Sequence, residues 1–109
     1  MVEDMDGTWF CYVLRPTRPD ILETGPTPEE GELTARHWEY TVGLYKEGTL
    51  ALAGRTTTPG DTFATIVVRA DDEAAARRIM EGDPGVAGGL FSAVLHPYEL
   101  FMLQGSVEP

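Results

Sequence analysis

The hydrophobic positions of this chain repeat with two periods, one typical of strands and one typical of helices. Four apolar runs rich in aromatic and β-branched residues predict strands over residues 8–14, 49–54, 62–70 and 92–103. The turn sequence Pro59-Gly60-Asp61 joins the middle two strands as an antiparallel hairpin. Pro97 lies within the last run, where it favours an edge position or a bend.

The helical period appears first in residues 28–47. Thr27 is a suitable N-cap, Pro28 suits the first helical position, and Gly48 stands where a C-terminal glycine is expected. His37 falls on the broad apolar arc of this helix and is expected to face the core. The preceding segment, residues 15–28, is rich in proline and predicts a loop, and so long a loop in a small domain is uncommon unless it has a function such as covering a site.

A second helix is predicted from the acidic start Asp71-Asp72-Glu73 to Gly82. Asp83-Pro84 then has the form of another cap, which opens one short helical turn. The resulting order, strand-helix-strand-strand-helix-strand, predicts an α+β fold with a ferredoxin-like antiparallel sheet and both helices on one face.

Both faces of the predicted sheet are apolar, because consecutive residues of the strands are apolar in turn. Trp9 and Cys11 alternate with Phe10 and Tyr12 in the first strand, and the other strands behave alike. Since two helices can cover only one face, we expect a second copy of the chain to cover the other, in a homodimer packed sheet against sheet. The alternative is that the loop over residues 15–28 folds across the open face.

Length and charge limit the classes of function. The chain has 109 residues and a formal net charge of −10, with 18 acidic against 8 basic side chains. So negative a chain repels the phosphate backbone, so nucleic-acid binding is not expected. Its length predicts one domain over residues 8–105, with a flexible N-terminal arm at 1–7 and a C-terminal tail at 106–109.

Neither a membrane segment nor a metal site is predicted. The acidic N-terminus is unlike a signal peptide, and no apolar run approaches the roughly 18 residues of a membrane span, so we expect a cytoplasmic protein. The single Cys11 excludes an intramolecular disulfide and is most simply a small buried hydrophobic residue. No cysteine and histidine spacing resembles a zinc site, and we expect no metal and no cofactor.

His37 and Asp83 are the candidate catalytic residues. Each has a structural interpretation, His37 as a packing residue of the core and Asp83 as a helix cap. Both positions nevertheless lie on the helix side of a ferredoxin-like sheet. A carboxylate beside an imidazole fixes its tautomer, which is the arrangement expected of a general base.

Four further residues are candidates for substrate binding. Arg15 and Arg18 begin the long loop and Arg55 follows a strand, and each can hold a carboxylate through bidentate bonds, although a solvated arginine is the simpler interpretation. Tyr40 lies one turn from His37, where it either donates a hydrogen bond into the same pocket or packs.

The stretch HWEYTVGLYKEGTLALAG, from His37 to Gly54, resembles the YCII-related (YciI-like) family. So does the ending, in which Gly82-Asp83-Pro84 precedes a short turn and a last strand with Pro97. The resemblance covers about residues 8 to 104. The chain departs from the family in its long proline-rich loop, in a short connection within the hairpin, and in His96, where another basic residue is more usual.

The resemblance implies a dimeric α+β barrel, with a His–Asp pair in a pocket between sheet and helices. The matching positions are His37 and Asp83. It implies general acid/base chemistry, and our first hypothesis is a cofactor-independent lyase or isomerase that moves a proton on a small organic molecule. One alternative is a small-molecule-binding or accessory domain without turnover, and another is an oxygen-using monooxygenase on the same barrel, whose specific motif the sequence lacks.

Overall fold

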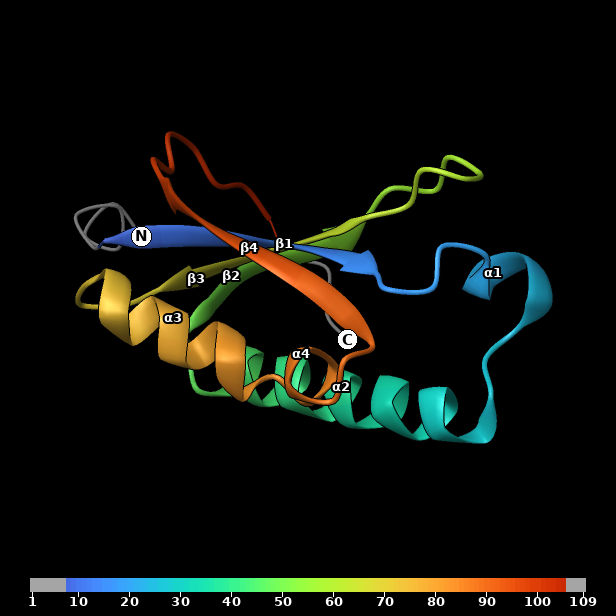
Figure 1. Cartoon of the computed structure of the whole chain (residues 1–109). Helices are drawn as coiled ribbons and strands as arrows, with labels where there is room; N and C mark the ends of the chain where they lie inside the picture. Colours follow the sequence, from blue (N-terminus) through green and yellow to red (C-terminus); the bar gives the residue numbers. More distant parts are fainter. Residues whose placement is uncertain (1–7, 106–109) are drawn as a thin grey trace.

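The computed structural model describes residues 8–105, so the predicted arm at 1–7 and tail at 106–109 lie outside the described residues. The helices and strands follow in the order β1 (Trp9–Pro16), α1 (Ile21–Thr24), α2 (Pro28–Lys46), β2 (Leu50–Arg55), β3 (Ala64–Arg69), α3 (Glu73–Gly82), α4 (Pro84–Ala87) and β4 (Phe91–Tyr98). All strand pairs are antiparallel, and the sheet order is β2-β3-β1-β4 (Figure 1). The predicted α+β fold with a ferredoxin-like sheet is confirmed.

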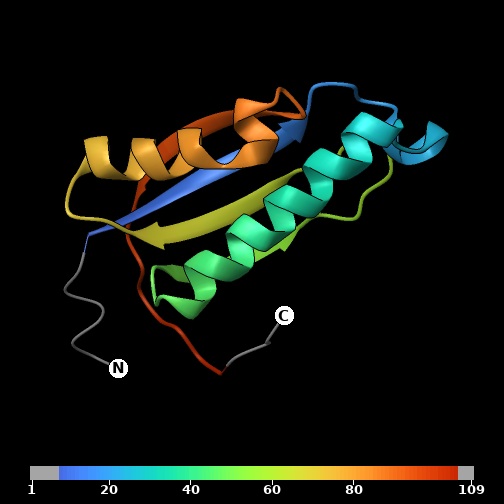
Figure 2. The same cartoon turned by 90° about the horizontal axis from the view of Figure 1, so that it is seen from below.

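The two long helices, α2 and α3, lie across the same face of the sheet, and α4 contacts both of them (Figure 2). Strand alternation explains the core beneath them, because every second residue of a strand points to the same face. The buried core residues on this face are Phe10, Tyr12, Leu14, Leu44, Ile66, Val68, Ala76 and Met80. Among the described residues 8–105, no helix is long and apolar enough to cross a membrane.

The predicted helix ends are confirmed. Thr27 and Glu30 form a capping box at the start of α2, in which each side chain accepts a hydrogen bond from the backbone N–H of the other. Gly48 follows α2 with a φ of 82°, the left-handed conformation that glycine adopts without strain. Asp72 caps α3 by accepting from the N–H of Ala75.

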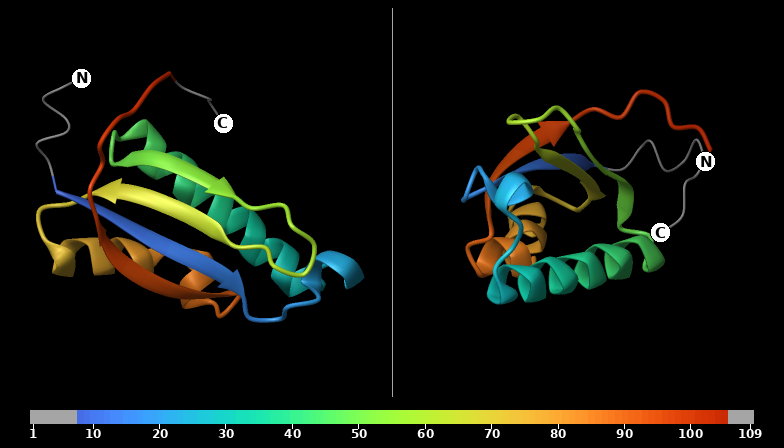
Figure 3. Two further views of the ribbon diagram at one scale, coloured as in Figure 1. Left: turned by 90° about the horizontal axis from the view of Figure 1, so that it is seen from above. Right: turned by 90° about the vertical axis from the view of Figure 1, so that its right-hand side faces the viewer.

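The face of the sheet away from the helices is apolar, and no helix of the described residues 8–105 covers it (Figure 3). Trp9, Cys11 and Val67 form a small buried cluster there, and Leu100 from the segment after β4 packs against it. The loop over residues 15–28 does not cover this face, because its apolar residues line a cavity on the helix side. The alternative that this loop folds over the open face is therefore wrong.

The last strand is shorter than predicted. The sequence pattern extends it to residue 103, whereas β4 ends at Tyr98. The physical reason is that, within residues 8–105, β4 pairs with β1 alone, and β1 begins at Trp9, the residue paired with Tyr98. Residues beyond Tyr98 therefore have no strand to pair with, although they are as apolar as a strand, and Phe101 stays 73% exposed.

Candidate active site

His37 and Asp83 are in contact in the structure. The imidazole Nδ1 lies 2.8 Å from Oδ1 and 2.9 Å from Oδ2 of the carboxylate. Asp83 is fully buried, and the His37 side chain is 15% exposed. Because a carboxylate can only accept, the proton of this contact is on Nδ1, and Nε2 is the nitrogen left for other chemistry.

Asp83 occupies the joint between α3 and α4, where it serves as the N-cap of α4. Its Oδ1 accepts a hydrogen bond from the N–H of Gly85 at 2.9 Å. A Cβ on Gly85 would lie 2.8 Å from the ring of Phe91, so glycine allows the turn to approach β4 closely. The predicted cap is confirmed, and the same side chain that caps the turn also meets the imidazole.

Tyr12 is a third member of this cluster that the sequence interpretation missed. Its hydroxyl donates to Oδ2 of Asp83 at 3.3 Å from the middle of β1, and its side chain is fully buried. Burial and the nearby Asp83 charge raise the pKa of Tyr12, so its phenol remains protonated as a donor. The signal was present in the sequence, since a tyrosine at a helix-facing strand position needs a partner for its hydroxyl.

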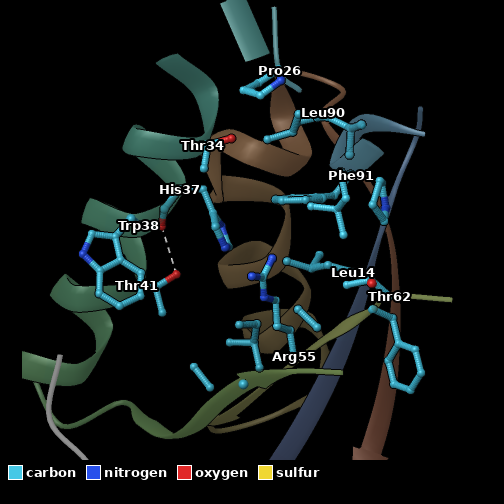
Figure 4. Close-up of a pocket in the computed structure, with 18 residues that line it drawn as sticks. Leu14, Pro26, Thr34, His37, Trp38, Thr41, Arg55, Thr62, Leu90 and Phe91 are labelled. Atoms are coloured by element: carbon cyan, nitrogen blue, oxygen red, sulfur yellow. Dashed lines mark hydrogen bonds between the residues drawn. The ribbon is translucent and has the colours of Figure 1, made fainter. Parts of the chain in front are cut away.

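The imidazole of His37 also lines a cavity of about 500 Å³ between α2, the sheet and the loop that contains α1. Its ring meets Phe91 edge-on, with centroids 5.1 Å apart. Figure 4 shows His37 reaching from α2 into this space, with Phe91 beside it. Other lining residues, none of which was predicted from the sequence as a site residue, include Leu14, Ile21, Leu22, Trp38, Phe63 and Ile66.

Arg55 is the one candidate arginine that the structure brings into this cavity. It closes β2 and lines the same space as His37. Arg15 instead lies 3.4 Å from Asp61 and stacks over Phe63, beside a smaller hollow. Only Arg55 is therefore placed to touch a molecule bound against His37.

Arg18 is fully engaged in shaping the loop. Its guanidinium donates to both carboxylate oxygens of Glu30, at 3.0 and 2.6 Å, and to the hydroxyl of Thr24 and the carbonyl of Gly25. The two bonds from Arg18 lower the pKa of Glu30 from its usual value to about 2. Arg18 thus positions the loop that forms one wall of the cavity, and it does not line the cavity.

Tyr40 lies outside the cavity as well. Its hydroxyl donates to the carbonyl of Ile79 at 2.7 Å, which ties α2 to α3. Burial, together with the charge of Asp83, raises the pKa of Tyr40. Tyr40 therefore has a packing position between α2 and α3, and its hydroxyl bonds to the protein backbone and not to a ligand.

Cys11 and His96 belong to the other face of the sheet, where they stand opposite each other on β1 and β4. Burial raises the pKa of the Cys11 thiol, which agrees with the expected packing role. Among residues 8–105, no group of at least 3 histidine, cysteine or acidic side chains is arranged to hold a metal ion.

Comparison with known proteins identifies the family. The family model for the YCII-related domain matches residues 10–95, and the chain therefore belongs to the YCII-related family. The resemblance inferred from the motifs is confirmed, while the domain limits at residues 8 and 105 stay predictions. Comparison with curated proteins gave no match.

A similar solved structure is 5-chloro-2-hydroxyhydroquinone dehydrochlorinase from Burkholderia phenoliruptrix AC1100, in complex with 2,5-dihydroxybenzoquinone. It is 21% identical to this chain, and the match covers 82% of this chain and 92% of that one, with a TM-score of 0.57. At this identity the similarity establishes a shared fold.

Proposed function

We propose that this protein is a cofactor-independent enzyme of the lyase or isomerase type, in which His37 transfers a proton on a small organic molecule. The observation that carries the proposal is the His37–Asp83 contact at 2.8 Å, in which Nδ1 is occupied and the imidazole lines a cavity. The apolar walls of that cavity suit an organic ring compound, and its volume is ample for one.

In the proposed elimination, Nε2 of His37 takes a proton from the substrate. The electron pair left behind moves through the conjugated skeleton and expels a leaving group, which departs with its bonding pair, so no oxidant or reductant is needed. The Asp83 carboxylate faces the imidazolium that forms, and the proton then passes to water. In an isomerisation, the imidazolium returns the proton to another atom of the same molecule.

The structural neighbour supports a substrate class. That protein is a dehydrochlorinase, and its structure holds a dihydroxybenzoquinone. We propose that the present pocket takes a small oxygenated ring of similar size. The chain's own residues favour this, because Phe91 and Trp38 offer aromatic walls on either side of His37.

Chloride release from 5-chloro-2-hydroxyhydroquinone tests the proposal. We expect turnover by the wild type and a loss of roughly 10² to 10⁴ in kcat for His37→Gln, the range for a general base. His96→Gln is the matched control, because His96 lies on the opposite face of the sheet. The absence of turnover in the wild type, with 2,5-dihydroxybenzoquinone still bound by His37→Gln, contradicts the enzyme and favours a non-catalytic binding domain.

We also propose that the functional unit is a homodimer packed through the open faces of two sheets. Large apolar side chains are exposed on that side of each chain, with Val94 56% and Tyr98 42% accessible. Sedimentation analysis of Val94→Asp tests this, with Glu99→Asp as a charge-conserving control near the same strand. A wild type that sediments as a dimer and a variant that sediments as a monomer are expected, and a monomeric wild type contradicts the proposal.

A further inference from the structure

We propose that Arg55 is the anion-binding residue of the cavity and that the protein therefore selects compact ring compounds carrying a carboxylate or an ionised hydroxyl. This inference rests on the pocket of the proposed function and narrows its substrate class. It follows from the distribution of charge around the cavity, from the lack of a partner for Arg55, and from its place relative to His37.

The cavity wall differs in charge from the rest of the protein. The chain carries 18 acidic side chains, yet no aspartate or glutamate is among the described residues that line the cavity. Arg55 is the only lysine or arginine in the described part of that lining. An anion repelled by the protein at long range thus meets one fixed positive charge and no carboxylate once it is inside.

Arg55 also differs from the arginines nearby in being unpaired. Arg15 has Asp61 as its partner, and Arg18 has Glu30. Within residues 8–105, the guanidinium of Arg55 makes no hydrogen bond and no ion pair with the protein. Its donors are therefore free for a ligand, and a carboxylate or a pair of neighbouring oxygens matches their fork geometry.

The position of Arg55 places a bound anion beside the proton-transfer group. Arg55 extends from the end of β2 into the cavity on the side facing α2, which carries His37 (Figure 4). A ring held between these two walls has its charged oxygen on the guanidinium and another atom toward the imidazole. Arg55 would thereby orient the ligand as well as select its charge.

Nuclear magnetic resonance provides a binding assay that does not need turnover. Trp38 lines the cavity, whereas Trp9 is buried on the opposite face of the sheet. Benzoate and benzamide are probes of the same size that differ in charge. We expect benzoate to shift the indole N–H signal of Trp38 while that of Trp9 stays in place, and to bind more tightly than benzamide.

Substitution of Arg55 gives the decisive comparison. In Arg55→Gln we expect benzoate binding to weaken by about tenfold, a modest loss for a charge-assisted contact, and the preference over benzamide to disappear. Arg55→Lys should retain part of the preference, because it keeps the charge and loses the fork. Arg36→Gln, on the exposed surface of α2, removes the same charge away from the cavity and serves as the control.

Undiminished benzoate binding by Arg55→Gln, equal binding of both probes by the wild type, or no binding of benzoate overturns the inference. Repeating the titration in His37→Gln separates it from the proposed function. If His37→Gln still prefers benzoate over benzamide and the wild type shows no turnover, only the enzyme proposal has failed. If turnover is lost in His37→Gln but the KM is unchanged in Arg55→Gln, only the inference about Arg55 has failed.

Discussion

Two carboxylates in this protein each receive three hydrogen-bond donors, yet their surroundings lead to different roles. Glu30 accepts twice from Arg18 and once from the backbone of Thr27 on the loop side of α2. Asp83 accepts from His37, Tyr12 and the backbone of Gly85 in the interior. Every hydrogen bond of Glu30 and Arg18 joins them to another protein group.

The Asp83 cluster ends on the imidazole of His37, which lines a cavity. Within the described residues, Nε2 of His37 has no hydrogen-bond partner, whereas the guanidinium of Arg18 is used at each of its nitrogens. The lesson is that a charged pair by itself says little about chemistry. The informative feature is a hydrogen-bond network that ends on a side chain lining a cavity, with one polar atom left unpaired.

Asp83→Ala should give the largest effect on stability. The change strands the Tyr12 hydroxyl and the Gly85 N–H in the interior and leaves His37 without its acceptor, so we expect the free energy of unfolding to fall by about 3 kcal/mol. Urea denaturation measures it. Asp61→Ala is the matched control, because Asp61 is 69% exposed and should change stability by less than about 0.5 kcal/mol. Equal midpoints for the two variants would contradict the central role of Asp83.

Tyr12→Phe sharpens the comparison by removing one donor while keeping the ring. Because the hydrogen bond is buried but long for an O–H···O contact, we expect a loss of about 1 kcal/mol in the free energy of unfolding, smaller than for Asp83→Ala. The matched control is Tyr45→Phe on α2, which removes a tyrosine hydroxyl in the same way. Val13→Ala is unsuitable as a control because it alters packing. A Tyr12→Phe variant as stable as the wild type means that the 3.3 Å contact contributes nothing net.

Glu30→Gln should give the smallest effect and one that depends on pH. The pKa of Glu30 is lowered from 4.5 to about 2 in the folded protein, mainly by Arg18. The ionised pair therefore stabilises the fold in full above about pH 4.5, and this contribution is lost as the pH falls through about 2. Unfolding measured from pH 6 to 2 should show the stability difference between wild type and variant shrinking toward acid. A difference that grows toward acid would refute the assignment.

The sequence predicted the order of the elements because each has a local cause. Thr27 and Asp72 cap helices, Gly48 ends one, and the unbroken apolar run of residues 9–14 marks a buried strand. The overlong last strand was wrong for a reason that local pattern does not contain, since its end is set by where β1 begins. The turn of α1 was missed because four residues carry no helical period.

The candidate site was predictable only in part. His37 and Asp83 were identified as residues, but 46 positions separate them, and their contact depends on how α4 packs against α2. The same nonlocal packing decides which arginine matters. Arg15, Arg18 and Arg55 look alike in the sequence, and the fold pairs the first two with carboxylates and leaves the third beside the cavity.

The loop that contains α1 has a consequence for redesign. It contributes Ile21, Leu22 and Pro26 to the cavity but makes no hydrogen bond to His37 or Asp83. Its shape is maintained by Arg18, which bonds to Thr24 and Gly25 within the loop and anchors it to Glu30 at the start of α2. The wall that meets a ligand is thus a separate, exchangeable part, and grafting another loop between Thr17 and Thr27 would change which molecules enter while the proton-transfer residues stay as they are.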